Sequence, residues 1–458
     1  MNVDGNIIAA RFIRETSWKG LPVEVRQKAK TCLLDNLGCM LAGSQARISR
    51  ICRDYVDTVW PQGNEASIVM QGCKSSLLGA AFVNANTANA TDMDDDGLYC
   101  DGHPGAQLVP ATLALAEKYG LNGKELLSAL VVGYEVAHRV GGCWHDYHQA
   151  FQACGAWGSV AIAAVASKVM GLDEDQIQHA LGIAEYHAGN LPMMRDIDHP
   201  AMVKHGLGWA AVTGLMAAGL AAKGFTGIPC LLGFEKYRSW AESFGRDFIM
   251  VRGVSFKRYS SCLWVHPAIV ACQKVISENK LALSQIAKIV VHGFHEMKRL
   301  GNRIPQTEEE AQFNVAWPLA VFLMYGEISP HHMLKENLSD QKLISLAEKI
   351  NVTESEEMNQ AHRQDIYPCR VEIFLHNECR LESGLVCYRH SGAGGGDKIY
   401  GDYVRHDDVA AKFMHITEPV VTRRTAQALL ELVDNLDSLE DLTPFVTLWA
   451  GRQFETQQ

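Results

Sequence analysis

The chain has 458 residues, of which 47% are hydrophobic and 21% are charged, and its formal net charge is -10 at pH 7. This length and composition predict a globular protein with a large core divided into two or more domains. The negative charge, without a basic stripe, argues against nucleic acid as a partner. No stretch offers 18 uninterrupted apolar residues, so we expect neither an export signal nor a membrane span.

The thirteen cysteines are odd in number and include no CxxC pair. A secreted chain of this size usually shows a paired cysteine framework, whereas cytosolic cysteines behave as small apolar residues. We therefore expect a cytoplasmic protein with reduced cysteines and no structural zinc.

The first 265 residues show helical patterns. Between Pro22 and Gly43, apolar residues recur at the spacings of three and four that are typical of a helix. A proline near the start and a glycine at the end are also typical of helix termini. Further helices are expected at 110–120 and 124–139. The segments 156–172 and 207–225 are rich in Ala and Gly on nearly all sides, which is typical of closely packed buried helices. The pattern predicts a large all-helical domain.

The following part of the chain mixes helices with strands. A helix at roughly 267–279 precedes the β-branched run KIVVHGFH, and residues 369–388 have the alternation of a hairpin with Asn-Glu at its turn. Helical segments at 309–325 and 340–349 lie between these strands. Such a mixture predicts a smaller α+β domain.

The glycine-rich stretch at 392–396 lacks the GxGxxG or GxxxxGK spacing, so we interpret it as a flexible connection rather than a nucleotide cradle. Helical periodicity returns from 409 to 436, in a piece that could pack back onto the large domain. The predicted fold is mainly α. It has an all-helical domain formed by residues 1–266 and 401–458 and an α+β lid formed by residues 267–400.

Five aspartates lie between positions 92 and 101 in the segment TDMDDDGLYCDGH, directly before His103. Magnesium binding, a solvated acidic loop and proton transfer would all use such residues. Against a metal site, the segment does not have the EF-hand pattern and no second acidic cluster completes a cage. Against a solvated loop, the segment lies between two apolar stretches, which is typical of residues that line a cleft. A histidine beside a carboxylate is a plausible acid or base, because its unperturbed pKa is about 6.5. We therefore predict a proton-transfer site without a metal.

Two basic positions complete this prediction. Lys204 directly precedes the apolar helix expected at 207–225, although a surface lysine with a packed apolar stem would have the same pattern. Lys257 and Arg258 lie at the boundary between the helical and the mixed parts. Cations at a domain boundary suit an anionic ligand in a cleft. Together with the aspartates and His103, they predict proton chemistry on a molecule that carries carboxylates.

Six segments resemble those of a known family in order and over most of the chain. They are LPVEVRQKAKTCLLDNLGCMLAG, DMDDD with HPGAQLVPATLALAE, GLNGKELLSALVVGYEVAHRVG, MVKHGLGWAAVTGLMAAGLAAKGFTG, FKRYSSC and EEAQFNVAWPLAVFLMYG. On these motifs the chain resembles the MmgE/PrpD family, which includes 2-methylcitrate dehydratase, cis-aconitate decarboxylase and iminodisuccinate epimerase. The resemblance implies a helical domain built from both chain ends, an α+β lid and a homodimer. It also implies action on small di- or tricarboxylates without a metal or organic cofactor.

The resemblance carries four catalytic residues over to this chain. Asp92 matches the first aspartate of the family's D-x-D-D segment, and His103 matches the histidine of its His-Pro pair. Lys204 matches the lysine before the Gly-x-Ala-Ala helix. Lys257 matches the lysine of the segment that reads FKRYSSC here.

The chain also departs from the decarboxylase branch of the family at positions expected to bind substrate. Asp96 stands where that branch has threonine, and Gln149, with His148 adjacent, falls near a histidine of the branch. Cys262 stands in place of a histidine and Trp317 in place of a tyrosine. These departures argue against cis-aconitate decarboxylation and favour dehydration or epimerisation.

The expected activity is that of a cofactor-independent lyase that abstracts a proton α to a carboxylate and eliminates water, as 2-methylcitrate dehydratase does. Lys204, Lys257 and Arg258 are expected to bind the substrate carboxylates and to stabilise the developing aci-carboxylate. His103, oriented by Asp92, is the preferred base or acid, and a lysine of depressed pKa is its rival. An epimerase of a dicarboxylate and a non-catalytic carboxylate-binding homologue remain the alternatives.

Overall fold

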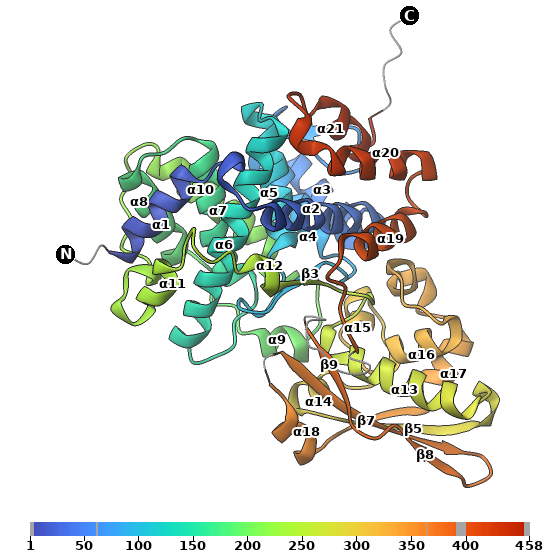
Figure 1. The fold of residues 1–458 in the computed structure, drawn as a ribbon. Coiled ribbons are helices and arrows are strands. Elements are labelled where there is room, and N and C mark those ends of the chain that lie inside the picture. Colours follow the sequence, from blue (N-terminus) through green and yellow to red (C-terminus); the bar gives the residue numbers. More distant parts are fainter. Residues whose placement is uncertain (1–3, 61–62, 364, 391–399, 453–458) are drawn as a thin grey trace, which may run out of the picture.

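The computed structural model describes residues 4–60, 63–363, 365–390 and 400–452. The protein is mainly α, as predicted, and Figure 1 shows a helical part above a smaller part that contains a sheet. Two separate hydrophobic cores correspond to these parts. One core takes its residues mainly from positions 9–256 and 409–450, and the other mainly from 262–388. We call the two parts the helical body and the lid, and we count residues 262–265 with the lid because they pack in its core. The predicted boundaries at 266 and 401 remain a proposal.

The helical body is formed by helices of different lengths that pack around a large apolar core. Its helices are α1 (Gly5–Glu15), α2 (Val23–Gly43), α3 (Arg47–Val59), α4 (Leu77–Ala88), α5 (Gly105–Tyr119), α6 (Gly123–Tyr147), α7 (Gly155–Val169), α8 (Glu174–Tyr186), α9 (Met193–Asp198), α10 (Leu207–Ala221), α11 (Arg238–Glu242), α12 (Met250–Gly253), α19 (His406–Thr417), α20 (Arg423–Asp434) and α21 (Thr443–Trp449).

The Ala- and Gly-rich helices α7 and α10 lie in close contact, as their composition predicts. A Cβ atom on Gly214 would lie 2.5 Å from the carbonyl oxygen of Ser159, so only glycine allows this approach. The predicted limits of two other helices were too narrow. The helix expected from 110 begins at Gly105, and the helix expected to end at 139 continues to Tyr147.

The C-terminal helices return to the helical body, as the sequence indicated. Helix α19 packs along α2, and the ammonium group of Lys412 lies 2.6 Å from a carboxylate oxygen of Asp35 in that contact. Lys412 also donates a hydrogen bond to the carbonyl oxygen of Met93, at 2.6 Å. Helix α19, in the C-terminal part of the chain, therefore fixes the backbone position of the aspartate-rich segment.

The lid combines a sheet with short helices. Its helices are α13 (His266–Asn279), α14 (His295–Leu300), α15 (Glu308–Gln312), α16 (Ala316–Tyr325), α17 (Gln341–Ala347) and α18 (Glu356–Ala361). Its strands are β5 (Ile286–Gly293), β6 (Ile350–Glu354), β7 (Ile366–Leu375), β8 (Arg380–Glu382), β9 (Val386–Arg389) and β10 (Tyr400–Gly401). The strand order is β10-β9-β7-β5-β6, and β8 pairs with β7 outside this path.

The predicted hairpin is confirmed, because β7 and β8 pair antiparallel with Ile373 opposite Leu381. Strand β9 then pairs with β7 as well. The single helix expected at 309–325 is instead α15 and α16, since Asn314 accepts a hydrogen bond from the backbone of Trp317 and begins a new helix there. The glycine-rich stretch at 392–396 lies outside the described residues.

A short two-stranded pairing joins the aspartate-rich segment to the body-lid boundary. Strands β3 (Asp95–Gly97) and β4 (Val254–Phe256) pair antiparallel, with Asp95 opposite Phe256. This pairing brings residues 92–97 next to Lys257, although the two regions are far apart in sequence.

All thirteen cysteines are free thiols, as expected. Among the described helices, none combines the length and the apolar character needed to cross a bilayer.

Candidate active site

A cavity of about 510 Å³ lies between the helical body and the lid. Its lining residues are Asp92, Asp96, Gly97, Asp101, Gly102, His103, Phe151, Met193, His205, Lys257, Cys262, Leu263, Trp264, Glu296, Phe313, His362, Tyr367 and His390. Five of the ten residues predicted for catalysis or substrate binding are among them. A cavity with convergent charged groups and apolar walls is the usual form of a small-molecule site.

The aspartate-rich segment is buried and does not form a solvated loop. Asp92 is 1% exposed, and its carboxylate lies 2.9 Å from the ammonium group of Lys257, which is fully buried. Asp92 also has a φ of 52°. A non-glycine residue in this left-handed region of backbone conformation is strained, and strained residues are concentrated at functional sites.

Asp92 and Lys257 stabilise each other's charges. Burial alone would raise the pKa of Asp92, but the positive charges of Lys257 and His103 hold it below its ordinary value. Burial alone would lower the pKa of Lys257, but Asp92 and Asp94 hold it above its ordinary value. Both groups are therefore ionised at neutral pH. Lys257 is thus not the lysine of depressed pKa that could replace His103 as the base.

His103 is held by carboxylates on both sides of its ring. Its Nδ1 atom lies 3.2 Å from Asp94 and 2.9 Å from the carbonyl oxygen of Asp95, while its Nε2 atom lies 3.5 Å from Asp92. Burial alone would lower the pKa of His103, but Asp94 and Asp92 raise it to about 9. The nearer orienting carboxylate is Asp94 rather than the predicted Asp92. At neutral pH the ring is a cation and can donate a proton.

Asp95 has a structural role behind the site. It accepts hydrogen bonds from the backbone of Gly105, at 2.9 Å, and from the hydroxyl of Tyr134, at 2.5 Å. Burial and the nearby charge of Asp35 raise its pKa to about 7. Asp95 thus fixes the start of α5 and the position of the neighbouring His103.

Asp96 lines the cavity, and its partner comes from a distant part of the chain. The carboxylate lies 3.3 Å from Nε2 of His390, which follows β9. Burial would lower the pKa of His390, but Asp96 raises it above the ordinary value. His390 is therefore a second histidine at the cavity wall whose charged form is favoured by a carboxylate.

Lys204 is buried beside the cavity without lining it. It is 1% exposed, and its ammonium group donates a hydrogen bond to the side chain of Gln312, at 2.7 Å. It is not the surface lysine that the sequence also allowed. Its positive charge contributes to holding the pKa of Asp92 low.

His205, next to Lys204, does line the cavity. Its ring is stacked on that of His103 with centroids 5.4 Å apart, and its Nδ1 atom lies 2.9 Å from the carboxylate of Asp196 in α9. Like Asp92, it has a left-handed backbone, with a φ of 55°. No sequence motif pointed to a role for His205.

Four residues predicted to bind substrate lie away from the cavity lining. His148 and Gln149 follow the end of α6, where His148 packs on Trp144 at 4.8 Å and Gln149 is exposed. Arg258 is exposed and lies over the ring of Tyr403 at 4.5 Å. Trp317 is buried in the core of the lid. Cys262, in contrast, lines the cavity, and burial raises the pKa of its thiol to about 12.

The lid supplies cavity residues that the sequence did not identify. They are mainly aromatic or apolar, and they are Leu263, Trp264, Phe313 and Tyr367. In the sequence these residues have the same appearance as core residues. No local sequence pattern pointed to His390 either, because its partner Asp96 lies almost 300 positions away in the chain.

The same wall offers donor atoms that a metal site would need. One ligand atom from each of Asp92, His103 and His205 lies within 4.8 Å of the others. However, the ammonium group of Lys257 lies 2.9 Å from Asp92, and His103 is held as a cation. Two positive charges beside the donor atoms disfavour a metal cation, so this set suits proton transfer better.

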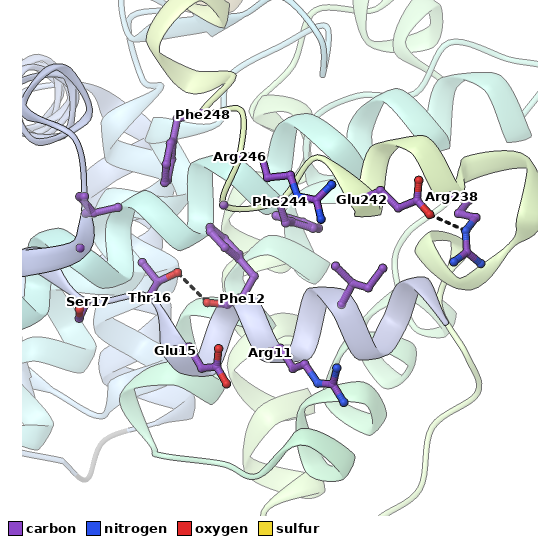
Figure 2. A pocket seen from close by; sticks show the side chains of 14 residues that line it. Arg11, Phe12, Glu15, Thr16, Ser17, Arg238, Glu242, Phe244, Arg246 and Phe248 are labelled. Atoms are coloured by element: carbon purple, nitrogen blue, oxygen red, sulfur yellow. Dashed lines mark hydrogen bonds and ion pairs between the residues drawn. The ribbon is translucent and has the colours of Figure 1, made fainter. Parts of the chain in front are cut away.

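A second cavity, of about 700 Å³, lies beside α1. Figure 2 shows Phe12 beside Phe244 and Arg238 paired with Glu242. The ring centroids of the two phenylalanines are 4.7 Å apart, and Nε of Arg238 lies 2.7 Å from the carboxylate of Glu242. Arg11 pairs with Glu174. These ion pairs are more exposed than that of Asp92 and Lys257, and exposed pairs are weak. We therefore place the candidate active site in the cavity between body and lid.

The fold and the site define a two-part protein in which a helical body and an α+β lid enclose a charged cavity. Residues 8–247 match the MmgE/PrpD N-terminal domain, and residues 259–438 match the MmgE/PrpD C-terminal domain. The chain belongs to the MmgE/PrpD family, as its motifs indicated.

Several relatives match over nearly their full length. A cis-aconitate decarboxylase-like protein of Aspergillus oryzae is 24% identical, covering 98% of each chain. Human cis-aconitate decarboxylase is 25% identical over 93% of this chain and 90% of its own length. The cis-aconitate decarboxylase of Aspergillus terreus is 24% identical over 93% of this chain and 92% of its own.

Proposed function

We propose that the protein is a cofactor-independent lyase that removes a proton α to a carboxylate of a small di- or tricarboxylate and eliminates water. The observation that carries this proposal is the buried group of Asp92, His103 and Lys257 at the cavity wall. The relatives support the substrate class, since they are named for action on cis-aconitate, which is a tricarboxylate.

The cations of the wall are suited to bind an anionic substrate. Lys257, His103 and His390 all line the cavity, and neighbouring carboxylates raise the pKa of each of them. In a low-dielectric cavity such charges act strongly on a carboxylate. Lys204 lies behind the wall and supports the charge of Asp92.

His103 then acts as the general acid. Loss of the α-proton leaves an aci-carboxylate, and Lys257 stabilises the negative charge that develops on its oxygens. The imidazolium of His103 protonates the hydroxyl group as the carbon-oxygen bond breaks, so that water leaves. Asp94 and the Asp95 carbonyl group hold the ring in place for this step.

Decarboxylation is the second candidate, because the relatives are cis-aconitate decarboxylases or proteins named as similar to them. In that reaction a carbon-carbon bond breaks, and His103 would protonate the resulting carbanion. Asp96 and Cys262, which line the cavity at departures from the decarboxylase branch, support elimination of water instead. Epimerisation would need the same first proton transfer.

We also propose that the protein is a homodimer. Trp209, Met216 and Leu220 lie on one face of α10 and are 61%, 48% and 38% exposed. Exposed apolar side chains that lie together on one face are typical of an interaction surface. Light scattering after size exclusion should give twice the mass of the chain, and a Trp209→Glu variant should give the mass of a monomer. A wild-type monomer would contradict the proposal.

Proton NMR in heavy water tests the proposed reaction. The protein is incubated with citrate, 2-methylcitrate, cis-aconitate, citraconate, malate, tartrate and aspartate-derived dicarboxylates. We expect loss of an α-proton signal together with a new vinyl signal from one acid. Exchange without a vinyl signal would indicate an epimerase. Thermal stabilisation by an acid without any exchange would indicate a non-catalytic binder and would contradict the proposed lyase.

A further inference from the structure

His205 has one free ring nitrogen at the cavity. Its side chain is buried, the residue is 2% exposed, and it belongs to the cavity lining. Within the described parts of the chain, its Nε2 atom has no hydrogen-bond partner. A buried polar atom without a partner costs free energy, and such exceptions call for a functional explanation.

Asp196 fixes the other side of this ring. Its carboxylate lies 2.9 Å from Nδ1 of His205 and accepts a hydrogen bond from the backbone N–H of the same residue, at 3.2 Å. Burial would raise the pKa of Asp196, but the hydrogen bond from His205 holds it below its ordinary value. An ionised carboxylate at Nδ1 favours the tautomer in which Nδ1 carries the proton and Nε2 carries the lone pair. This arrangement prepares Nε2 to accept a proton.

The two stacked histidines have different surroundings. His103 lies between the carboxylates of Asp92 and Asp94, whereas the side chain of His205 has one carboxylate partner, Asp196. The rings lie 5.4 Å apart at an interplanar angle of 17°, and one nitrogen of each lies within 4.8 Å of the other. Two adjacent titratable groups in different environments are the usual basis for separate acid and base roles.

The charged groups around His205 come from three parts of the chain. Asp196 belongs to α9, Asp92 and His103 belong to the aspartate-rich segment, and Lys204 precedes His205 directly. The lid contributes the uncharged ring of Phe313, with its centroid 5.5 Å from that of His205. Lys204 and His103 are therefore the cationic neighbours of His205, and Asp196 and Asp92 are its anionic neighbours.

We propose that His205, positioned by Asp196, is the base that removes the α-proton, and that His103 is the separate acid. This inference rests on the proposed lyase function. The α-carbon-hydrogen bond breaks, Nε2 of His205 takes the proton, and the electron pair moves into the carboxylate. As the carbon-carbon double bond forms, the hydroxyl group leaves with a proton from His103. The proton on His205 returns to His103 or to solvent and restores both groups.

Substitution of each histidine separates the two roles. In heavy water, His205→Asn is expected to reduce both α-proton exchange and water elimination by at least about 100-fold, as loss of a general base does. Asparagine suits the left-handed backbone at this position. His103→Gln is expected to retain exchange within a few-fold while water elimination falls by a similar factor. His187→Gln, an exposed histidine of the helical body, serves as the matched control.

Asp196→Asn tests the positioning role without removing the base. We expect kcat to fall by at least about ten-fold with KM within three-fold, because a misoriented base loses general-base efficiency. The acidic limb of the pH-rate profile should move to lower pH, since the imidazolium that forms loses its counter-charge. A purely structural aspartate would change the thermal midpoint without moving this limb.

Three outcomes separate the possible failures. Wild-type protein that exchanges no proton with any acid overturns the proposed function and this inference with it. Exchange that survives in His205→Asn but is lost in His103→Gln overturns the inference alone and makes His103 the base. Near wild-type elimination by His205→Asn, with an unchanged thermal midpoint, also overturns it.

Discussion

The helical body and the lid contribute different chemistry to the same cavity. The body side supplies Asp92, His103 and Lys257, which are buried and carry paired charges. The lid supplies mainly apolar and aromatic side chains, together with the buried His390, which pairs with Asp96 of the body. Its other charged pair, Glu296 and His362, is 3.8 Å apart with side chains 34% and 26% exposed. Because water screens exposed charges, the strong electrostatic effects belong mainly to the body. The comparison indicates that the body performs the reaction and the lid shapes the substrate pocket.

The largest expected effect is the loss of charge in the body. Asp92→Asn keeps the size of the side chain and tolerates the φ of 52°, but it leaves Lys257 without its anion. We expect kcat to fall by about 10²- to 10⁴-fold, the usual range for loss of a group that supports acid-base catalysis. Steady-state kinetics on the substrate found by NMR gives this value. Asp54→Asn, at an exposed aspartate of α3, is the control, and an Asp92→Asn enzyme within five-fold of wild type would refute the role.

The contact between α19 and α2 should affect both stability and rate. Lys412→Met leaves Asp35 buried without its partner, and breaking a buried pair costs roughly 3–5 kcal/mol of unfolding free energy. The carbonyl group of Met93 also loses its donor, so kcat should fall. Urea unfolding and kinetics measure the two effects.

The double variant Asp35→Asn/Lys412→Met sharpens this prediction. It removes both buried charges, so its stability should exceed that of Lys412→Met alone. If the double variant loses the sum of the two single losses, the pair is not coupled.

A change in the lid should affect binding more than chemistry. Trp264→Ala removes an apolar part of the cavity wall. We expect KM to rise about ten-fold with kcat within three-fold, because lost apolar burial of this kind costs roughly 1–3 kcal/mol. A fall of kcat by 100-fold at unchanged KM, in a variant that melts as wild type does, would show that the lid takes part in the chemistry.

The smallest effect is expected away from the cavity, at Glu185 of α8. Burial raises its pKa to about 7, above the unfolded value, so its ionisation destabilises the folded state as pH rises from about 4.5 to 7. Glu185→Gln should therefore stabilise the protein by about 1–2 kcal/mol at pH 8 and have little effect at pH 4.5. Urea unfolding at both pH values measures this, and an equal effect at both would exclude a titration of Glu185.

The sequence predicted those site residues that have a local pattern. Asp92, Asp96 and His103 lie in one short segment between two apolar helices, and this segment is buried at the cavity. The helical and mixed parts of the fold were predictable for the same reason, since periodicity is a local property.

The remaining site residues depend on contacts that periodicity does not encode. His390 meets Asp96 across almost the whole chain, and the lid aromatics lie at the cavity only because the lid packs on the body. Arg258 is adjacent to Lys257 in sequence, but it lies in the bend that follows strand β4. Lys257 is accordingly buried, whereas Arg258 is exposed.

The most direct test of the account is the protonation state of His103 in the intact protein. Nitrogen-15 NMR of histidine-labelled protein, with the His103 signals assigned by their absence in His103→Gln, reports the charge of this ring as pH is changed. Because Asp94 and Asp92 raise the pKa of His103 to about 9, the ring should be an imidazolium at pH 7 and should lose its proton around pH 9. A neutral His103 ring at pH 7 would contradict the proposed general acid.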